Sequence, residues 1–215
     1  VDGGSVTIGG AGIAAVVTTT GTGSLDISST AVSIADDTTI EAVGGVTFKS
    51  DTSIAIGDNV IFDVGGTLLT EHGTITLDSS TSGITIGTNS VLNAHGGDVI
   101  ITAAAAGTLA IGEGTDIAAT RDVAFDIDGE ISVAGSLSPG RFLDIQTGDG
   151  AAVEGKFTLE TTGSIDVSTD LVIGAADATN SNIELISIGA GAVDLAGTVT
   201  TAGDVYIDLD GLAIA

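Results

Sequence analysis

The chain has 215 residues, with 29 acidic and only 4 basic side chains, and a formal net charge of −25. This charge excludes nucleic acid and anionic lipid as partners, because too few lysines and arginines are present to neutralise phosphates. Hydrophobic residues make up 43% of the chain, aromatic residues only 3%, and 33 residues are glycine. Valine, isoleucine, leucine and alanine must therefore build the core. This composition favours short strands and tight corners over helices.

No segment of the sequence is suited to cross a membrane as a helix. The longest uncharged stretch, Gly3 to Leu25, is interrupted by Gly, Thr and Ser, so it contains no run of about 18 apolar residues. We therefore expect no membrane insertion. The chain starts at Val1 inside a strand-like phrase, and we expect residues 1–215 to be one continuous segment of a longer polypeptide, without an internal domain boundary.

A short corner motif recurs along the chain, in which an apolar residue is followed by Gly or Ala and then by small or polar residues. The interval between copies is shortest from Ile34 to Ile56 and from Ile111 to Val133, and longest from Val133 to Val167. A unit of this size cannot bury its own apolar side, so the repeats are predicted to stack as coils. Clear copies begin at Ile8, Ile34, Ile56, Ile86 and Ile111, and looser copies at Val133, Val167 and Leu195.

Glycine pairs and runs of alternating apolar and polar residues recur at similar distances after these corners. The pairs are predicted to be structural corners because glycine supplies the backbone angles that tight turns need. Between corners, apolar and polar residues alternate over short runs such as Thr74–Leu77 and Val205–Asp210, which is the period of a half-buried strand. The glycine pairs are Gly44-Gly45, Gly65-Gly66 and Gly96-Gly97.

These features together predict the fold. The phrases Ile131–Gly150 and Ala192–Gly211 align with each other as strand, corner, short strand, corner and strand. Repeated phrases with small corners favour a solenoid over a hairpin sandwich, which is the alternative. We predict an all-β, right-handed parallel β-helix (β-solenoid) of about eight irregular coils. Its inward core ladder is predicted to include Ile34, Ile56, Ile86, Ile111 and Ile207.

Three phrases carry a family resemblance: Ala42–Asn59, Asn93–Gly114 and Gly197–Gly211. They resemble the repeats of filamentous-haemagglutinin-type proteins, which are large bacterial exoproteins that include adhesins secreted by the two-partner route. The resemblance covers most of the chain. It implies a right-handed parallel β-helical shaft and a secreted or cell-surface location in bacteria.

Two acidic runs are candidate calcium sites. Asp126, Asp128 and Glu130 form one run, and Asp208 and Asp210 form the other. Each run places two carboxylates on one outward face of a strand beside a glycine, and Ca²⁺ prefers oxygen ligands in flexible loops. The alternative is a solvated acidic surface that keeps a β-rich protein from self-pairing. The glycine-rich nonapeptide of calcium β-rolls is missing.

The first two acidic corners are predicted to lie one above the other. Asp36-Asp37 and Asp58-Asn59 follow the corner residues of successive coils, so their side chains are expected to stack. Stacked carboxylates about 5 Å apart repel unless an ion or a polar partner lies between them.

The two histidines offer a weaker metal hypothesis. His72 and His95 are about one coil apart, so they could stack on neighbouring coils with Glu71 nearby. The alternative is that both occupy polar corners beside glycine.

Nothing in the sequence indicates catalysis, and we expect no enzyme activity. No Gly-x-Ser-x-Gly nucleophile motif and no cysteine is present, and the acids are spread over the whole chain. Gly10-Ala11-Gly12 is not followed by a predicted helix, so a dinucleotide site is not expected. A polysaccharide-active β-helix enzyme is retained as an alternative.

The functional prediction is a stiff shaft or filament-forming unit of a secreted fibrous protein. Its open strand edges favour end-to-end stacking with copies of itself or with adjoining repeats. Glycans or proteins of a host or surface are further possible partners. A calcium-binding adhesin module is the main alternative, with Ca²⁺ as the one possible cofactor.

Overall fold

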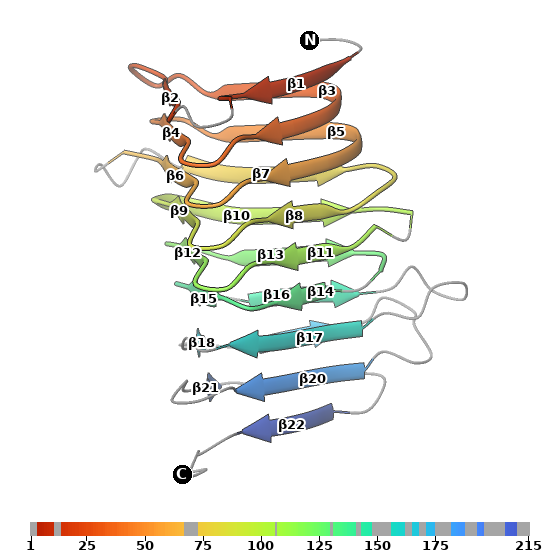
Figure 1. Cartoon of the computed structure of the whole chain (residues 1–215). Helices are drawn as coiled ribbons and strands as arrows, with labels where there is room; N and C mark the ends of the chain where they lie inside the picture. Colours follow the sequence, from red (N-terminus) through yellow and green to blue (C-terminus); the bar gives the residue numbers. More distant parts are fainter. Residues whose placement is uncertain are drawn as a thin grey trace.

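The computed structural model describes residues 4–10, 14–66, 73–105, 107–129 and 131–140, and beyond residue 140 the seven strands from β16 to β22. Every element in the described part is a β-strand, and every strand pair is parallel. The strands stack into an elongated solenoid, with the N-terminus and the C-terminus at opposite ends (Figure 1). The predicted all-β, parallel β-solenoid is therefore confirmed, whereas its right-handedness and the number of coils stay predictions.

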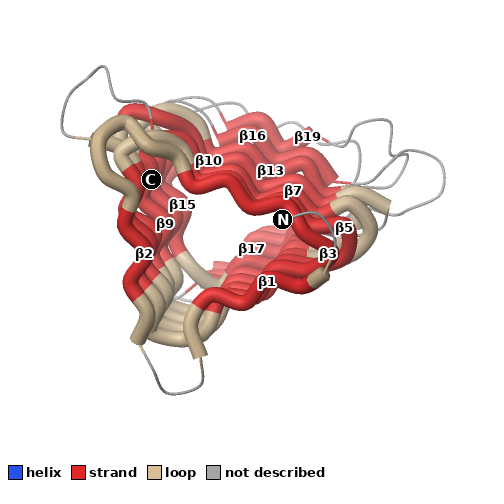
Figure 2. Tube along the Cα trace, turned by 90° about the horizontal axis from the view of Figure 1, so that it is seen from above, coloured by secondary structure: helices blue, strands red, loops and turns tan. Residues whose placement is uncertain are grey.

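Three strand faces enclose the interior, as seen along the stack in Figure 2. Face 1 contains the second halves of β3 (Leu25–Ile34) and β5 (Val46–Ile56), together with β1 (Ser5–Ile8), β8 (Ile84–Ile86), β11 (Leu109–Ile111), β14 (Ile131–Val133), β17 (Lys156–Thr161), β20 (Asn182–Ser187) and β22 (Val205–Leu209). Face 2 contains β2 (Val16–Thr18), β4 (Thr39–Ala42), β6 (Ile61–Val64), β9 (Val91–Ala94), β12 (Asp116–Ala119) and β15 (Ser136–Pro139).

Face 3 completes each coil and returns the chain to face 1. It contains the first halves of β3 and β5, followed by β7 (Gly73–Ser79), β10 (Gly96–Ala103), β13 (Val123–Ile127), β16 (Leu143–Thr147) and β19 (Leu171–Gly174). Strands β3 and β5 run across the corner from face 3 to face 1, with a register shift between Ser29 and Ala31 where the strand bends. Strands β18 (Ile165–Val167) and β21 (Val193–Leu195) pair with each other, and β18 lies beside β15.

One column of register-matched residues runs through the whole of face 1. Its described side chains from Ile34 to Ile111 are at most 3% exposed. Of the predicted ladder, Ile34, Ile56, Ile86 and Ile111 are buried and lie in this column. Ile207 shares their register on β22, but its side chain lies outside the described part, so its inward position stays a prediction. In chain order the column contains Ile8, Ile34, Ile56, Ile86, Ile111, Val133, Leu159, Leu185 and Ile207.

Two of the looser corner copies were assigned to the wrong face. Val167 and Leu195 lie on β18 and β21 and pair with each other, while Leu159 and Leu185 occupy the face 1 column. The alignment of Ile131–Gly150 with Ala192–Gly211 was wrong for the same reason, since it matched β14 of face 1 to β21. Short alternating strands occur on all three faces, so the pattern alone does not distinguish one face from another.

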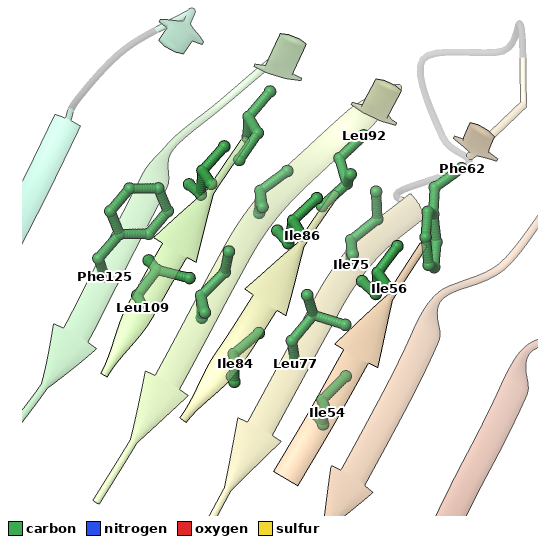
Figure 3. Packing of buried hydrophobic residues seen from close by; sticks show 14 of the residues in the cluster. Ile54, Ile56, Phe62, Ile75, Leu77, Ile84, Ile86, Leu92, Leu109 and Phe125 are labelled. Carbon is green, nitrogen blue, oxygen red and sulfur yellow. The ribbon is translucent and has the colours of Figure 1, made fainter. Parts of the chain in front are cut away.

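The core consists of stacked aliphatic side chains with a few aromatic rings (Figure 3). Phe48 and Phe62 meet edge to face, with ring centroids 5.9 Å apart, and both side chains are fully buried. Phe125 fills a similar inward position further along the stack. The narrow interior holds mainly Val, Ile and Leu, as the composition predicts.

Candidate functional site

The acidic corners between face 1 and face 2 have the same backbone conformation in successive coils. The third residue after each face 1 isoleucine has a positive φ, which is 57° at Asp37, 55° at Asn59 and 53° at Asn89. Asp and Asn tolerate this left-handed region better than most residues, and the next coil has Gly114 there, with φ of 70°. The backbone N–H of Asn59 donates to the carbonyl of Thr88 in the following coil at 2.9 Å.

The carboxylates of these corners bind backbone amides of the next coil. Asp36 Oδ1 accepts a hydrogen bond from the N–H of Asp58 at 2.9 Å. Asp58 Oδ1 accepts one from the N–H of Thr88 at 2.6 Å. Asn59 Nδ2 donates to Asp37 Oδ1 at 3.1 Å. The predicted stack of Asp36-Asp37 on Asp58-Asn59 is confirmed, and its polar partners are amides of the protein itself.

A column of buried hydroxyl groups lies beneath the same corners. Ser90 Oγ donates to the carbonyl of Gly57 at 3.1 Å and accepts from the N–H of Val60 at 3.1 Å. Thr115 Oγ1 repeats this arrangement one coil later, donating to the carbonyl of Gly87 at 2.7 Å and accepting from the N–H of Ser90 at 3.3 Å. These hydroxyls replace ladder bonds where the chain turns. The sequence analysis missed them, although each follows a face 1 isoleucine by four positions.

Thr38 occupies the corresponding position at the N-terminal end of this hydroxyl column. Its side chain is fully buried, and its Oγ1 has no hydrogen-bond partner. Val60 separates it from the hydroxyl of Ser90 and carries no hydroxyl of its own. An unpaired buried hydroxyl is a local cost to stability.

The predicted glycine pairs lie at the corner between face 2 and face 3, but they are not equivalent to one another. Gly44 and Gly96 follow the register-matched Ala42 and Ala94 by two positions, whereas Gly65 follows Val64 directly. Gly73 is the register partner of Gly96, so Gly66 does not fill that role. Among these glycines, Gly65 and Gly97 have the least room for a side chain. Gly65 has φ of 106°, and a Cβ added to it would lie 2.2 Å from the carbonyl oxygen of His95. A Cβ added to Gly97 would lie 2.4 Å from the carbonyl oxygen of Gly73. Gly45 is less crowded, with its nearest contact 3.2 Å away at Thr74.

The two candidate calcium runs lie on different faces. Asp126 is exposed on β13 of face 3, in register with Thr102 and Gln146, whereas Asp208 belongs to β22 of face 1. The two runs therefore do not share a single site.

Within the first run, Asp128 has a partner in the preceding coil. Its Oδ2 accepts a hydrogen bond from the N–H of Ala105 at 2.6 Å. Glu130, Asp210 and the side chain of Asp208 lie outside the described residues. Within the described part of the chain, no group of three or more His, Cys, Asp or Glu side chains is placed to hold a metal ion.

Of the two histidines in the metal hypothesis, the structure describes only His95. His95 Nε2 lies 2.8 Å from Asp63 Oδ1 and 3.1 Å from Asn93 Nδ2, on the outer side of face 2. His72 and Glu71 lie outside the described residues, so their predicted stacking with His95 stays a prediction. His95 contacts an acid and an amide, which is a polar corner of the kind the alternative hypothesis describes.

Two basic side chains each approach an acid on face 3. Lys49 Nζ lies 3.9 Å from Asp78 Oδ2, and both side chains are partly exposed. Arg121 Nε lies 3.5 Å from Asp98 Oδ1, which also accepts the N–H of Asp122 at 3.1 Å. Pairs this exposed contribute little to stability, about 1 kcal/mol or less each.

Two hollows on the surface of the described coils are shallow and open. One is lined mainly by small residues of face 1 and its corner, including Ser33, Ala35, Ala55 and Gly57. Another lies over β3 and β5 and is lined by Asp26, Ile27, Ser28, Thr47 and Lys49. Neither lining contains a histidine or a pair of carboxylates, so neither resembles a general acid–base site.

The fold and the corner geometry were compared with known proteins. No family model matches the chain, and neither the curated proteins nor the solved structures contain a significant match. In the part of the chain that the structure describes, no helix is long and apolar enough to cross a membrane.

Proposed function

We propose that this chain is a stiff structural shaft of a fibrous protein that is secreted or displayed on a bacterial surface. The observation that carries the proposal is the single column from Ile8 to Ile207, in which every step is a parallel, register-matched strand pair. A continuous column of this kind transmits load along the stack through backbone hydrogen bonds.

The contacts of the corner acids support the same role. Asp36 and Asp58 bind amides of the following coil, so part of the negative charge stabilises the stacking of coils. The other acids in the described part of the chain lie mostly on the outer surface, where they keep strand-rich molecules apart. The surface location and adhesive context follow from the resemblance of the repeated phrases to filamentous-haemagglutinin-type repeats.

A shaft should tolerate removal of one whole coil, and this is the experiment that tests the proposal. Deleting residues 84–108 joins Gly83 to Leu109, which is the register partner of Ile84, so every face keeps its alternation. The shortened protein should fold cooperatively and lose about 4.8 Å of length, the spacing between neighbouring strands. Deleting residues 84–96 is the matched control, because it breaks the register and should prevent folding of the adjoining coils.

The second candidate function is a calcium-binding adhesin module. The observation in its favour is the exposed carboxylate of Asp126 two positions before Asp128 on face 3. Binding of Ca²⁺ by isothermal titration calorimetry, lost in the Asp126→Asn variant, would favour this function over a passive shaft.

A further inference from the structure

Three polar side chains from two successive coils meet on the outer side of face 2. Asp63 lies on β6 and Asn93 on β9, and the two residues are register partners on neighbouring parallel strands (Figure 1). His95 follows Asn93 by two positions, so both lie on the outward side of the chain, with the buried Ala94 between them. His95 Nε2 lies 2.8 Å from Asp63 Oδ1 and 3.1 Å from Asn93 Nδ2. The imidazole nitrogen is therefore the point where the three groups converge.

The backbone of His95 is held from both sides. Its N–H donates to the carbonyl of Val64 at 2.7 Å, and its carbonyl accepts the N–H of Gly73 at 3.1 Å. A Cβ added to Gly65 would lie 3.0 Å from the Cβ of His95, so the two coils also pack closely here. These contacts fix the point at which the imidazole leaves the backbone. A group positioned in this way loses less conformational freedom when it binds a ligand.

Hydrogen bonds within the cluster leave one of its groups without a proper partner. A ring nitrogen of neutral histidine either donates or accepts, and a carboxylate only accepts. If Nε2 donates to Asp63, it does not accept from the Asn93 amide nitrogen. Turning the amide by 180° brings its oxygen toward Nε2, and a single N–H then faces two acceptors. A cation in place of that hydrogen would satisfy the nitrogen and both oxygens together.

The separations between these atoms fit adjacent ligands of one metal ion. With metal–ligand bonds of about 2.1 Å, two ligands lie about 3.0 Å apart at a right angle and about 3.4 Å apart at the tetrahedral angle. The observed 2.8 and 3.1 Å correspond to the right angle. Right-angled geometry is typical of Cu²⁺ and Ni²⁺, whereas Zn²⁺ prefers a tetrahedron.

We propose that Asp63, Asn93 and His95 form a binding site for a divalent transition-metal ion, with Cu²⁺ and Ni²⁺ as the best-fitting ions. The ligands are Asp63 Oδ1, Asn93 Oδ1 and His95 Nε2. Water completes the coordination, because the His95 and Asp63 side chains are 44% and 55% exposed. Two of the ligands are ionisable and the third is an amide, so the site differs from a cluster of three ionisable ligands, which the described coils lack.

The ligand types separate this site from the calcium hypothesis. Ca²⁺ and Mg²⁺ prefer oxygen ligands alone, whereas imidazole nitrogen favours transition metals. The net charge of −25 attracts any divalent cation to the surface, and Glu41, the register partner of Asp63 in the preceding coil, adds to this attraction locally. Selectivity for a transition metal therefore depends on His95.

Isothermal titration calorimetry with NiCl₂ tests the site, in millimolar Mg²⁺ to occupy carboxylates that bind cations without selectivity. The natural chain should bind one Ni²⁺. Asp63→Ala should weaken binding by at least about tenfold, since even a residue that only supports a metal ligand costs this much when it is lost. Asp51→Ala is the matched control, because it removes the same charge from an exposed position elsewhere, and it should leave the affinity within about twofold.

Electron paramagnetic resonance of bound Cu²⁺ identifies the nitrogen ligand. The chain has two histidines, His72 and His95, so two single variants are sufficient. The spectrum of the natural chain should show coupling to one imidazole nitrogen. His95→Ala should lose this coupling, and His72→Ala should retain it.

Two outcomes would overturn the inference. One is Ni²⁺ binding by the natural chain no tighter than by Asp63→Ala and His95→Ala. The other is loss of the nitrogen coupling in His72→Ala. The site does not depend on the shaft function, because deleting residues 84–108 removes Asn93 and His95 and should abolish Ni²⁺ binding in a protein that still folds. The two proposals therefore fail separately.

Discussion

Asp58 accepts a hydrogen bond from the backbone N–H of Thr88, which belongs to the next coil, with 2.6 Å between Oδ1 and nitrogen. The side chain of one coil thereby substitutes for a ladder bond at a place where the chain turns and strand pairing is interrupted. Asp36 makes the same contact with the N–H of Asp58. Acids that would repel one another if only their charges are considered therefore form hydrogen bonds between successive coils.

Asp58→Ala should lower the free energy of unfolding by about 1 kcal/mol, because the amide of Thr88 loses its partner. Asp51→Ala is the matched control, since Asp51 is also an exposed acid on the same solenoid and removes the same charge. Urea unfolding at one pH and ionic strength measures both variants. Equal stability of the two variants would show that the amide contact contributes nothing beyond charge.

Gly87→Ala should destabilise the protein by roughly 2 kcal/mol, which is typical of overpacking. An added Cβ at Gly87 would lie 2.5 Å from the carbonyl carbon and oxygen of Gly57 in the preceding coil, where the backbone has little room to move. Gly10→Ala serves as the control, because nothing lies within 4 Å of its added Cβ. If thermal unfolding shifts equally in both variants, close approach of the corners is not what requires glycine.

Ile86→Ala should cost about 2–5 kcal/mol, the range for large-to-small changes in a packed core. Ile86 is 1% exposed and lies between Ile56 and Ile111 in the face 1 column. Thr85→Ala, on the outward side of the same strand, should change stability by less than about 0.5 kcal/mol. Chemical denaturation distinguishes them, and the reverse order would contradict the assigned register.

The two ends of the buried hydroxyl column should respond in opposite directions to the same substitution. Thr38→Val removes an unpaired buried hydroxyl and should stabilise the protein by about 1 kcal/mol. Thr115→Val should destabilise it by about 1–3 kcal/mol, because the carbonyl of Gly87 and the N–H of Ser90 lose their partner. Differential scanning calorimetry measures both changes. Destabilisation by Thr38→Val would mean that its hydroxyl has a partner.

Calcium should raise the unfolding temperature no more than magnesium does at the same ionic strength, because Asp36, Asp58 and Asp128 already accept hydrogen bonds from backbone amides. Thermal unfolding in EDTA and in millimolar Ca²⁺ or Mg²⁺ makes the comparison. A rise specific to Ca²⁺ would instead favour the adhesin module, and its loss in Asp126→Asn would locate the site.

The sequence predicted the inward column well because an isoleucine followed by glycine or alanine marks one particular corner in successive coils. The same reasoning predicted the stacking of Asp36-Asp37 on Asp58-Asn59. It failed at Val167 and Leu195, because strands of three to six alternating residues look alike on all three faces. Only the pairing partners show which face a strand belongs to.

Two parts of the corners were harder to predict, for different reasons. Gly73, and not Gly66, is the register partner of Gly96. The glycine pair Gly65-Gly66 alone does not indicate that the matching glycine comes later in the sequence. The hydroxyl column of Thr38, Ser90 and Thr115 was within reach, since each residue follows its face 1 isoleucine by four positions. Val60 occupies the same position after Ile56 and has no hydroxyl, so the hydroxyl residues do not recur in every coil.

The central claim is that the described coils form one rigid stack, and a distance between two spin labels tests it most directly. Ser33 is an exposed position on face 1, and Thr158 shares its register five steps away, through Ala55, Thr85, Ala110 and Ser132. With cysteines placed at both positions and labelled, double electron–electron resonance should give one narrow distribution near a Cα separation of about 24 Å, five strand spacings. A broad distribution, or a distance that does not shorten by about one strand spacing when residues 84–108 are deleted, would contradict the shaft.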